Sequence, residues 1–433
     1  MRSQCTESPT AGSILALALP ALGVLIATPL FLLLDTALIG QYGGATLLAA
    51  LATGTTLYAI VTTQLTFLSY GTTARAARLF GAGHKDEAVA EGVQATWVAI
   101  AIGLMLLAIM WFGAPVFTLW LSDNDEIASL ATSWLRVVSF AIPLVLVDMA
   151  GNGWLRGVQN TRAPLVFTLA GIIPGAILIP ILVYSYGLIG SAWATLIGTA
   201  ITAACFLSAL VRAHLGSWLP QWSIISNQLV LGRDLILRSL AFQVALISAA
   251  AVAGRFGAAA LGAHQVLLQL WNFIALVLDS LAIAAQSMVG AALGAGRVAV
   301  ARSVGVKVML YSVAFSLVLA VVLAAGYVVV PSIFTSDAAV IAALFKPWWQ
   351  LVLLVPVGGV VFALDGVLLG AGDAAFLRST TLVAATCGYV PGIWLAYVFD
   401  TGLVGVWWGL VAFMFIRLLA CGWRFQSMQW ARV

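Results

Sequence analysis

The chain has 433 residues, of which 63% are hydrophobic and only 8% are charged, and its formal net charge is +4. A soluble domain carries about 25% charged residues, and a soluble fold of this length has too little polar surface to cover so much apolar area. The composition therefore excludes an ordinary soluble protein and predicts an all-α membrane protein, in which each spanning helix needs about 20 apolar residues.

Twelve apolar segments of helical length follow one another along the chain, and we predict that each spans the membrane. They cover residues 13–34, 45–70, 92–113, 130–150, 163–185, 190–212, 229–252, 260–284, 303–326, 344–368, 376–398 and 403–424. None of them alternates apolar and polar residues, as the strands of a membrane barrel would. The first segment lacks a clear cleavage site and a basic flank, so we expect it to stay in the mature chain as the first span.

The basic residues predict the orientation of these spans. With a cytoplasmic N-terminus, 16 of the 19 lysines and arginines lie at the inner ends of the spans, and only Arg136, Arg255 and Lys346 lie at the outer ends. This asymmetry is typical of inner-membrane proteins. We therefore expect a multi-pass protein of the plasma (inner) membrane with both termini in the cytoplasm. The basicity reflects topology and does not indicate nucleic acid as a partner.

The two halves of the sequence resemble each other at an offset near 213 residues. The matched positions include Gly153-Trp-Leu-Arg-Gly157 with Gly366-Val-Leu-Leu-Gly370, Pro143 with Pro356, and Pro174-Gly175 with Pro391-Gly392. Each half holds six segments, so the repeats are parallel and predict two pseudo-symmetric lobes with a cavity between them. We predict an N-terminal six-helix lobe at residues 1–212, a cytoplasmic linker at 213–228 and a C-terminal six-helix lobe at 229–433.

Four motifs occur in an order and spacing that point to one family. They are Asp35-Thr-Ala-Leu-Ile-Gly40, Leu155-Arg-Gly-Val-Gln-Asn-Thr-Arg162, Asp279-Ser-Leu-Ala-Ile-Ala-Ala-Gln286 and Asp365-Gly-Val-Leu-Leu-Gly-Ala-Gly-Asp373. Through them the chain resembles the multidrug and toxic compound extrusion (MATE) family, and its DinF-like branch in particular. The resemblance implies twelve helices in two lobes that form a V. It also implies export of organic, often cationic and amphiphilic compounds, driven by inward H⁺ or Na⁺.

Asp35 is the first candidate for the coupling acid. An ionisable group inside a membrane span is costly and therefore points to function. The predicted helix around Asp35 also contains Pro20 and Pro29, and proline allows a helix to bend. Protonation of Asp35 is thus expected to change how this helix packs, and the resemblance implies a cation-coupling acid here. The alternative is a carboxylate satisfied by Ser, Thr or backbone groups.

The predicted fifth span departs from one pattern of the family. Some members carry an Asn and an Asp four residues apart there, whereas this chain has no acidic residue between Asp148 and Asp234. A sodium site needs several oxygen ligands, usually with at least one carboxylate. A single acid therefore favours H⁺ over Na⁺, although Asn152 and Thr195 are candidates to supply neutral oxygens beside Asp35. We interpret Asp148 itself as structural, paired with Arg156 or Arg162.

A second acidic site is predicted in the C-terminal half, at Asp279 and Asp365. The remaining candidates are polar or aromatic side chains on the eighth segment that are suited to line a cavity for a flat cation, namely Gln269, Trp271, Asn272 and His264. Two alternatives stay open. Asp365 is also consistent with a residue that caps a helix end, and His264 with a histidine satisfied in the core.

The sequence gives no sign of an enzyme. It contains no Walker motif, no nucleophile–base arrangement and no metal-ligand spacing, and its cysteines (Cys5, Cys205, Cys387 and Cys421) are too scattered for a disulfide framework. We expect no cofactor and no bound metal. The expected partners are a small organic substrate, H⁺ or Na⁺ and membrane lipid, and we expect the chain to act as a monomer.

The leading hypothesis is a secondary antiporter that exports amphiphilic compounds in exchange for H⁺ by alternating access. The first alternative is a flippase for lipid-linked precursors within the same superfamily. Such proteins carry a more basic central cavity, whereas the basic residues here lie at the cytoplasmic ends of the predicted spans. The second alternative is a membrane receptor or scaffold, which would leave the asymmetric acids within the spans unexplained.

Overall fold

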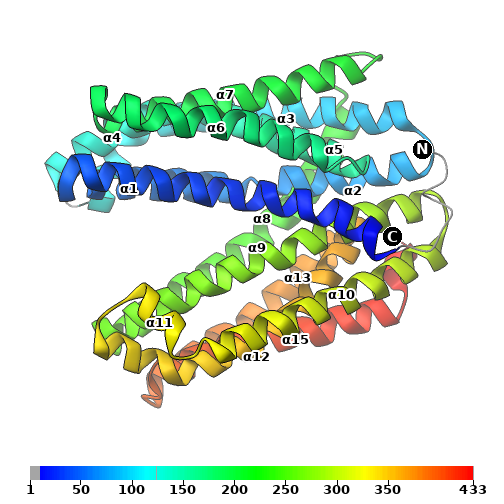
Figure 1. The fold of residues 1–433 in the computed structure, drawn as a ribbon. Coiled ribbons are helices and arrows are strands. Elements are labelled where there is room, and N and C mark those ends of the chain that lie inside the picture. The colour runs from blue at the N-terminus through cyan, green and yellow to red at the C-terminus, as the bar shows by residue number, and fades with distance from the viewer. Residues whose placement is uncertain (1–9, 123, 433) are drawn as a thin grey trace. The chain divides into compact units, whose positions relative to one another are not determined.

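The computed structural model describes residues 10–122 and 124–432, and nearly all of them are helical (Figure 1). The elements are α1 (Ala11–Gln64), α2 (Phe67–Gly81), α3 (Lys85–Ser122), α4 (Asp125–Ser139), α5 (Ala141–Gly157), α6 (Arg162–Tyr186), α7 (Leu188–Ala213), α8 (Trp222–Arg255), α9 (Ala258–Gly294), α10 (Val298–Ala325), α11 (Val329–Phe334), α12 (Ala338–Gly370), α13 (Ala374–Ala384), the π turn η1 (Ala385–Tyr389), α14 (Val390–Val398), α15 (Gly402–Gln426) and the 3₁₀ turn η2 (Gln429–Arg432).

The membrane spans agree in number with the prediction. Within the described residues, eleven helices are long and apolar enough to cross a bilayer, and the bent pair α4–α5 makes a twelfth when it is taken as one span. Six of these spans come before residue 214 and six come after residue 221. The predicted all-α membrane fold is confirmed.

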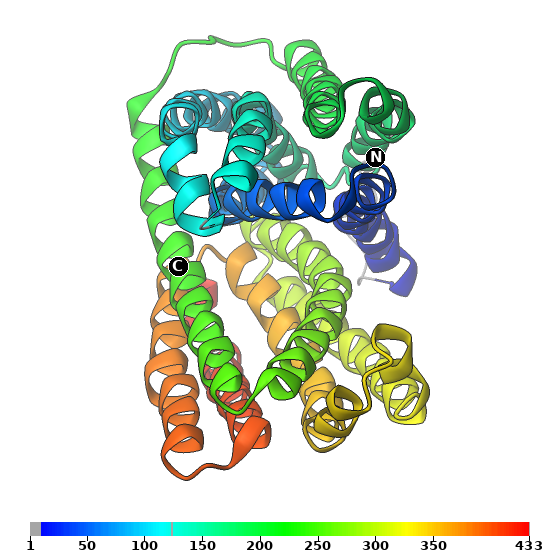
Figure 2. The ribbon, with the colours of Figure 1, turned by 90° about the vertical axis from the view of Figure 1, so that its left-hand side faces the viewer.

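Helix α1 contains two spans rather than one. Gly44, with φ 67 and ψ −169, breaks the helix and separates a first span, Ala11–Gln41, from a second that continues through α2 to Gly81. Figure 2 shows the change of direction between the dark blue first part of α1 and the lighter blue second part. Positive φ costs little at glycine because it has no Cβ, so the sharp turn falls at this residue.

The fourth span is bent by 44° between α4 and α5. Asn124 starts α4 by accepting a hydrogen bond from the backbone N–H of Ile127 at 3.0 Å, and two acidic residues follow in the first turn. Both features stabilise the beginning of a helix. The predicted segment 130–150 therefore covers only the middle of a longer, two-part span.

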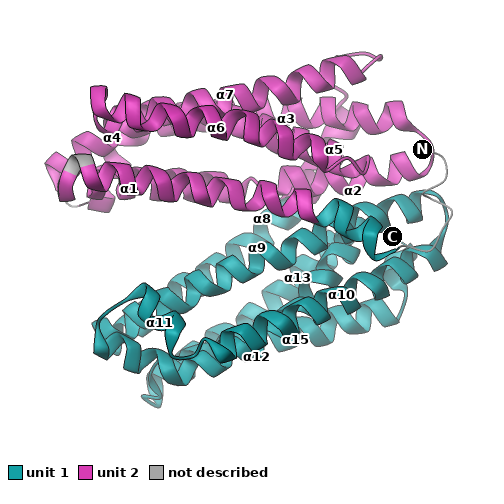
Figure 3. Cartoon of the chain, viewed as in Figure 1, with its two compact units in different colours: residues 1–18, 233–433 teal, residues 19–232 magenta. Residues whose placement is uncertain are grey.

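The chain divides into two compact units, which Figure 3 shows in different colours. One contains residues 19–232, and the other contains the residues up to 18 and those from 233 onward. The predicted linker 213–228 is helical from Trp222. Its non-helical part is attached to α3, because Gln94 Nε2 donates to the carbonyl of Leu219 at 3.1 Å and Gln94 Oε1 accepts from the N–H of Gln221 at 2.8 Å.

The internal repeat is realised as two equivalent helix contacts. A Cβ on Gly153 of α5 would lie 2.8 Å from the carbonyl oxygen of Ser69 in α2. A Cβ on Gly366 of α12 would lie 2.7 Å from Cα of Ala282 in α9. Both glycines and both of their partners are 213 positions apart. Small residues let membrane helices approach closely, so the same packing joins α2 to α5 and α9 to α12.

We expect Gly366→Ala to lower the melting temperature of the detergent-solubilised protein by several degrees. The added methyl group would meet the backbone of α9, and overpacking of this kind costs about 1–3 kcal/mol. Gly422→Ala on α15 is the matched control, because nothing lies within 4 Å of its Cβ position. Equal melting temperatures for the two variants, measured by fluorescence-detected size exclusion, would contradict the close contact.

A π turn interrupts the eleventh span. The N–H of Val390 donates to the carbonyl of Ala385, five residues earlier, and Pro391 follows directly. Proline has no N–H to donate, and its ring clashes with the carbonyl four residues before it. The wider turn relieves that clash and leaves α13 and α14 as two α-helical segments of one span.

Candidate functional site

Asp35 lies in the C-terminal half of the first span and is buried, with 2% of its surface exposed. Ser191, in the first turns of α7, donates a hydrogen bond from Oγ to Asp35 Oδ2 at 2.7 Å. The other carboxylate oxygen, Oδ1, is buried and has no hydrogen-bond partner among the described residues. The beginning of a helix also favours a negative charge, so α7 supplies both a hydroxyl donor and a positive dipole end.

Trp134 of α4 extends this contact to a third helix. Its indole N–H donates to Ser191 Oγ at 3.2 Å, so a polar chain runs from Trp134 through Ser191 to Asp35. The indole is held in place by Tyr58, which meets it edge-on at 6.4 Å, and by Gly54, whose Cβ would lie 2.5 Å from the ring. Neither Ser191, which bonds to Asp35, nor Trp134, which bonds to Ser191, was predicted from the sequence. Ser191 lies one helical turn before the predicted Thr195, which was the available signal.

The predicted neighbours of Asp35 are not joined to it. In the described part of the chain, no hydrogen bond links Asp35 to Asn152 or Thr195. Asn152 Nδ2 donates to the backbone carbonyl of Asp148 at 3.1 Å on α5. Oδ1 of each of these two residues is buried and has no hydrogen-bond partner among the residues that the structure describes. Thr195 accepts a hydrogen bond at its backbone carbonyl from Thr199 Oγ1 at 2.8 Å.

Asp148 does not have the arginine partner that the sequence suggested. Arg156 donates instead to Ser69 Oγ at 3.4 Å, across to α2. No ion pair of Asp148 with Arg156 or Arg162 occurs in the described residues, so that pairing is a wrong prediction. Asp148 lies in the middle of α5, within the bent fourth span, so it is a further acidic group inside a span of the N-terminal half.

We expect Ser191→Ala to slow transport while leaving the fold intact. A hydrogen bond to a charged group contributes about 1.5–3 kcal/mol, so we expect the export rate to fall by about tenfold. Ser191→Thr keeps the hydroxyl and should retain most of the activity. Ser185→Ala is the control, because Ser185 is exposed and its hydroxyl donates to the carbonyl of Ile181 on its own helix. The measurement is the initial export rate of each variant in proteoliposomes. A wild-type rate for Ser191→Ala would show that Ser191 has no role at the site.

Asp365 lies in a buried cluster of charges in the C-terminal half. Its Oδ2 accepts hydrogen bonds from Arg238 of α8 and from Arg417 of α15. Asp365 is 5% exposed and Arg417 is 6% exposed, so both charges lie almost out of reach of solvent. Two further ion pairs join neighbouring helices in the same unit, Asp234 with Arg378 at 2.5 Å and Asp373 with Arg424 at 2.7 Å. This arrangement favours a structural role for Asp365.

The other predicted site residues of this half do not gather around one cavity. His264 accepts a hydrogen bond at Nδ1 from the indole N–H of Trp407 at 3.2 Å and is 1% exposed. Trp271 is buried against Phe362 at 6.4 Å between ring centroids. Two residues on the same helix, Gln269 and Asn272, are exposed, and Asp279 is half-buried. The structure therefore separates Trp271 and His264, which face the core, from the exposed amides.

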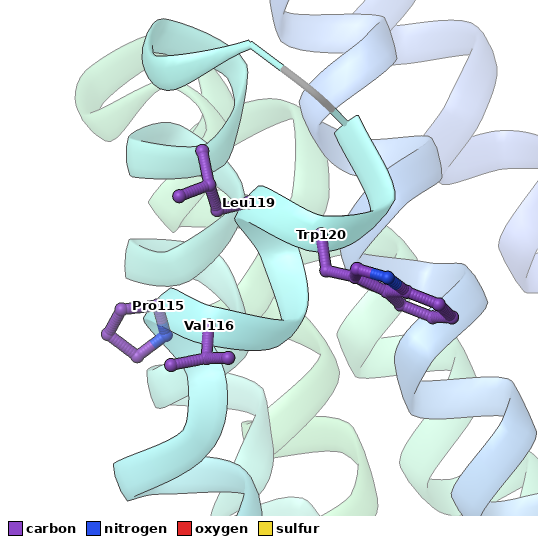
Figure 4. Close-up of a pocket in the computed structure, with 4 residues that line it drawn as sticks. All are labelled: Pro115, Val116, Leu119 and Trp120. Carbon is purple, nitrogen blue, oxygen red and sulfur yellow. The ribbon is translucent and has the colours of Figure 1, made fainter.

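Figure 4 shows a shallow hollow on α3, lined by Pro115, Val116, Leu119 and Trp120. All four side chains are apolar or aromatic, so the hollow offers no charged group for a coupling ion. Among the cysteines, Cys205, Cys387 and Cys421 are free thiols, and Cys5 lies outside the described residues. Asp35 with Ser191 and Trp134 remains the candidate site that the geometry of the described chain supports best.

Comparison with known proteins gives a consistent result over the whole length. The family model described as MatE matches residues 20–181 and 235–398, once in each half. The DNA damage-inducible protein F of Escherichia coli is 28% identical over 94% of this chain and 91% of its own length. The probable multidrug resistance protein NorM of Rhizobium meliloti is 26% identical over 95% of this chain and 92% of its own.

The fold has solved counterparts as well. A multidrug resistance MATE family transporter of the MOP superfamily, determined in an outward-facing conformation, superposes with a TM-score of 0.85. It is 19% identical, and the match covers 96% of both chains. A family model that matches most of the chain, together with full-length relatives, supports the resemblance drawn from the sequence motifs. The chain belongs to the MatE family, the multidrug and toxic compound extrusion transporters.

Proposed function

We propose that this protein exports amphiphilic, often cationic organic compounds from the cell in exchange for inward H⁺, and that Asp35 is the coupling acid. One observation carries the proposal. A carboxyl group in a membrane span is buried, keeps only Ser191 as its hydrogen-bond donor in the described chain, and leaves Oδ1 unsatisfied. Such a group is costly to maintain, which makes it a functional candidate. The Rhizobium relative is named as a probable multidrug resistance protein, which supports a drug-like substrate.

The choice of H⁺ over Na⁺ rests on the surroundings of Asp35. The contact face between α6 and α7 is made of small residues, because a Cβ on Gly175 would lie 3.4 Å from the carbonyl of Ala194. This face carries no side-chain carboxylate that would join Asp35 in binding a metal cation. Na⁺ is a hard cation that prefers several oxygen ligands. A proton needs only one acceptor, so the site suits H⁺ better.

Coupling would act through the packing of the first span. Asp35 and Ser191 join α1 to α7, and protonation removes the charge that Ser191 and the start of α7 stabilise. Pro20 and Pro29 lie inside this span and each remove a backbone hydrogen bond, which allows the span to bend when that contact weakens.

We further propose, from the distribution of basic residues, an inner-membrane location with both termini cytoplasmic. Asp279 remains our candidate for the second acidic site, which we predicted in the C-terminal half.

The proposal is tested by transport into and out of proteoliposomes that contain the purified protein. A fluorescent cation such as ethidium is loaded, and a pH gradient or a Na⁺ gradient is imposed separately. We expect export to follow the pH gradient and to be indifferent to Na⁺. Export driven by Na⁺ alone would replace H⁺ as the coupling ion. Export driven by neither gradient would contradict the antiporter proposal and favour a flippase.

A further inference from the structure

A groove of about 300 Å³ lies between two helices on the surface of the C-terminal unit. One side is formed by α8 and the other by α14. Its lining residues are Ser248, Val252, Arg255, Val390, Ile393, Trp394 and Tyr397. Six of the seven are apolar, aromatic or a small hydroxyl, and the seventh is an arginine at one end. The groove is therefore mainly apolar and carries a single positive charge, at one end.

The spacing of these residues makes the groove long and narrow. Ser248, Val252 and Arg255 occupy positions i, i+4 and i+7 of α8, so they lie along one face of that helix. Val390, Trp394 and Tyr397 follow the same spacing on α14. Each of these two sets of residues forms a stripe along its helix, and each stripe extends over two helical turns, or roughly 10 Å. The π turn η1 lies immediately before Val390, and such turns often occur beside functional sites.

Arg255 closes one end of the groove. It is in the last turn of α8, and its guanidinium group lies over the ring of Tyr397 at 5.3 Å. Arg255 is exposed, and in the described part of the chain no carboxylate lies within ion-pair distance of it. An arginine at the end of a spanning helix reaches the level of the lipid phosphates, and Trp and Tyr are typical of the same depth.

We propose that this groove is a binding site for an anionic phospholipid. The acyl chain lies along Val252, Val390 and Ile393, and the phosphate group is paired with Arg255. Tyr397 holds the guanidinium group towards the phosphate by stacking beneath it. The unpaired positive charge at the boundary favours a headgroup with net negative charge, such as phosphatidylglycerol, over a zwitterionic one.

The chain offers a matched control for this arginine. Arg136 is also exposed, is predicted on the same side of the membrane, and lies over Trp111 at 5.9 Å. It borders neither stripe of the groove. Arg136→Gln therefore removes an equivalent positive charge from the surface without touching the proposed site. A second groove variant, Val252→Trp, fills the apolar part of the groove and leaves Arg255 in place.

The test is native mass spectrometry of the purified full-length protein in detergent, with added phosphatidylglycerol or phosphatidylcholine. We expect the wild type and Arg136→Gln to bind phosphatidylglycerol about fivefold more tightly than phosphatidylcholine. Arg255→Gln should lose that preference, and Val252→Trp should weaken the binding of both lipids. The proposal is overturned if Arg255→Gln keeps the preference, or if Arg136→Gln loses it equally. It also fails if the wild type shows no preference, since the groove would then bind acyl chains alone.

Discussion

Replacing Asp35 with asparagine is expected to abolish coupled export and leave the protein folded. Asparagine keeps the shape of the side chain, and its carbonyl oxygen still accepts the hydrogen bond from Ser191. The asparagine side chain cannot take up or release a proton, so the pH gradient can no longer drive export through this residue. We expect the export rate in proteoliposomes to fall to that of protein-free vesicles, with a melting temperature close to that of the wild type.

Asp400→Asn is the control for this result. Asp400 is exposed in the turn before α15 and has φ 51, a conformation that asparagine tolerates well. That variant should transport normally. If Asp35→Asn also exports at the wild-type rate under a pH gradient, Asp35 is a structural group. The coupling role would then pass to Asp148 or Asp279, which also lie within spans.

Replacing Asp365 with asparagine is expected to cause the largest loss of stability. The change leaves Arg238 and Arg417 without their shared carboxylate, and Arg417 has only 8% of its side chain exposed. Removing one partner of a buried ion pair costs about 3–5 kcal/mol, because the remaining charge stays out of water. We therefore expect a melting temperature well below that of Asp35→Asn, measured by fluorescence-detected size exclusion in detergent.

Asp234→Asn is the matched comparison. Asp234 also contacts two arginines in the same unit, but the side chains of Arg378 and Arg233 are 25% and 61% exposed. Their charges remain partly hydrated after the carboxylate is lost, so the cost is smaller. A loss of stability in Asp234→Asn as large as that in Asp365→Asn would show that burial does not set the cost of these pairs.

The number and order of the spans were predictable because hydropathy directly reports which residues tolerate hydrocarbon. The ends of the spans were not. The predicted segment 92–113 lies inside α3, which runs from Lys85 to Ser122, because the backbone stays hydrogen-bonded in a helix beyond the apolar core. The bend at Phe140 and the six-residue α11 also escaped prediction, although Pro143 follows the bend and Pro331 lies inside α11. Proline also occurs inside unbroken spans of this chain, so its presence alone does not mark a break.

The candidate site was predictable only in part. An acid inside an apolar segment is visible in the sequence, so Asp35 was found. Its partner Ser191 lies 156 positions away, and no local pattern indicates which turn of α7 faces it. The same limit explains Asp365, whose arginines are 127 and 52 positions distant. Trp271 was assigned to a cavity because helical spacing alone does not say which face of α9 is turned inward.

The π turn in the eleventh span has a consequence for how the two halves diverged. Pro174 follows Gly157 by 17 positions, whereas Pro391 follows Gly370 by 21. The five residues Ala385–Tyr389 lie within this longer interval. A π turn holds one residue more than the α-helical turn it replaces. The second half therefore holds more residues than the first over the matched interval, and its transmembrane helix accommodates one of them as a local widening instead of in a surface loop.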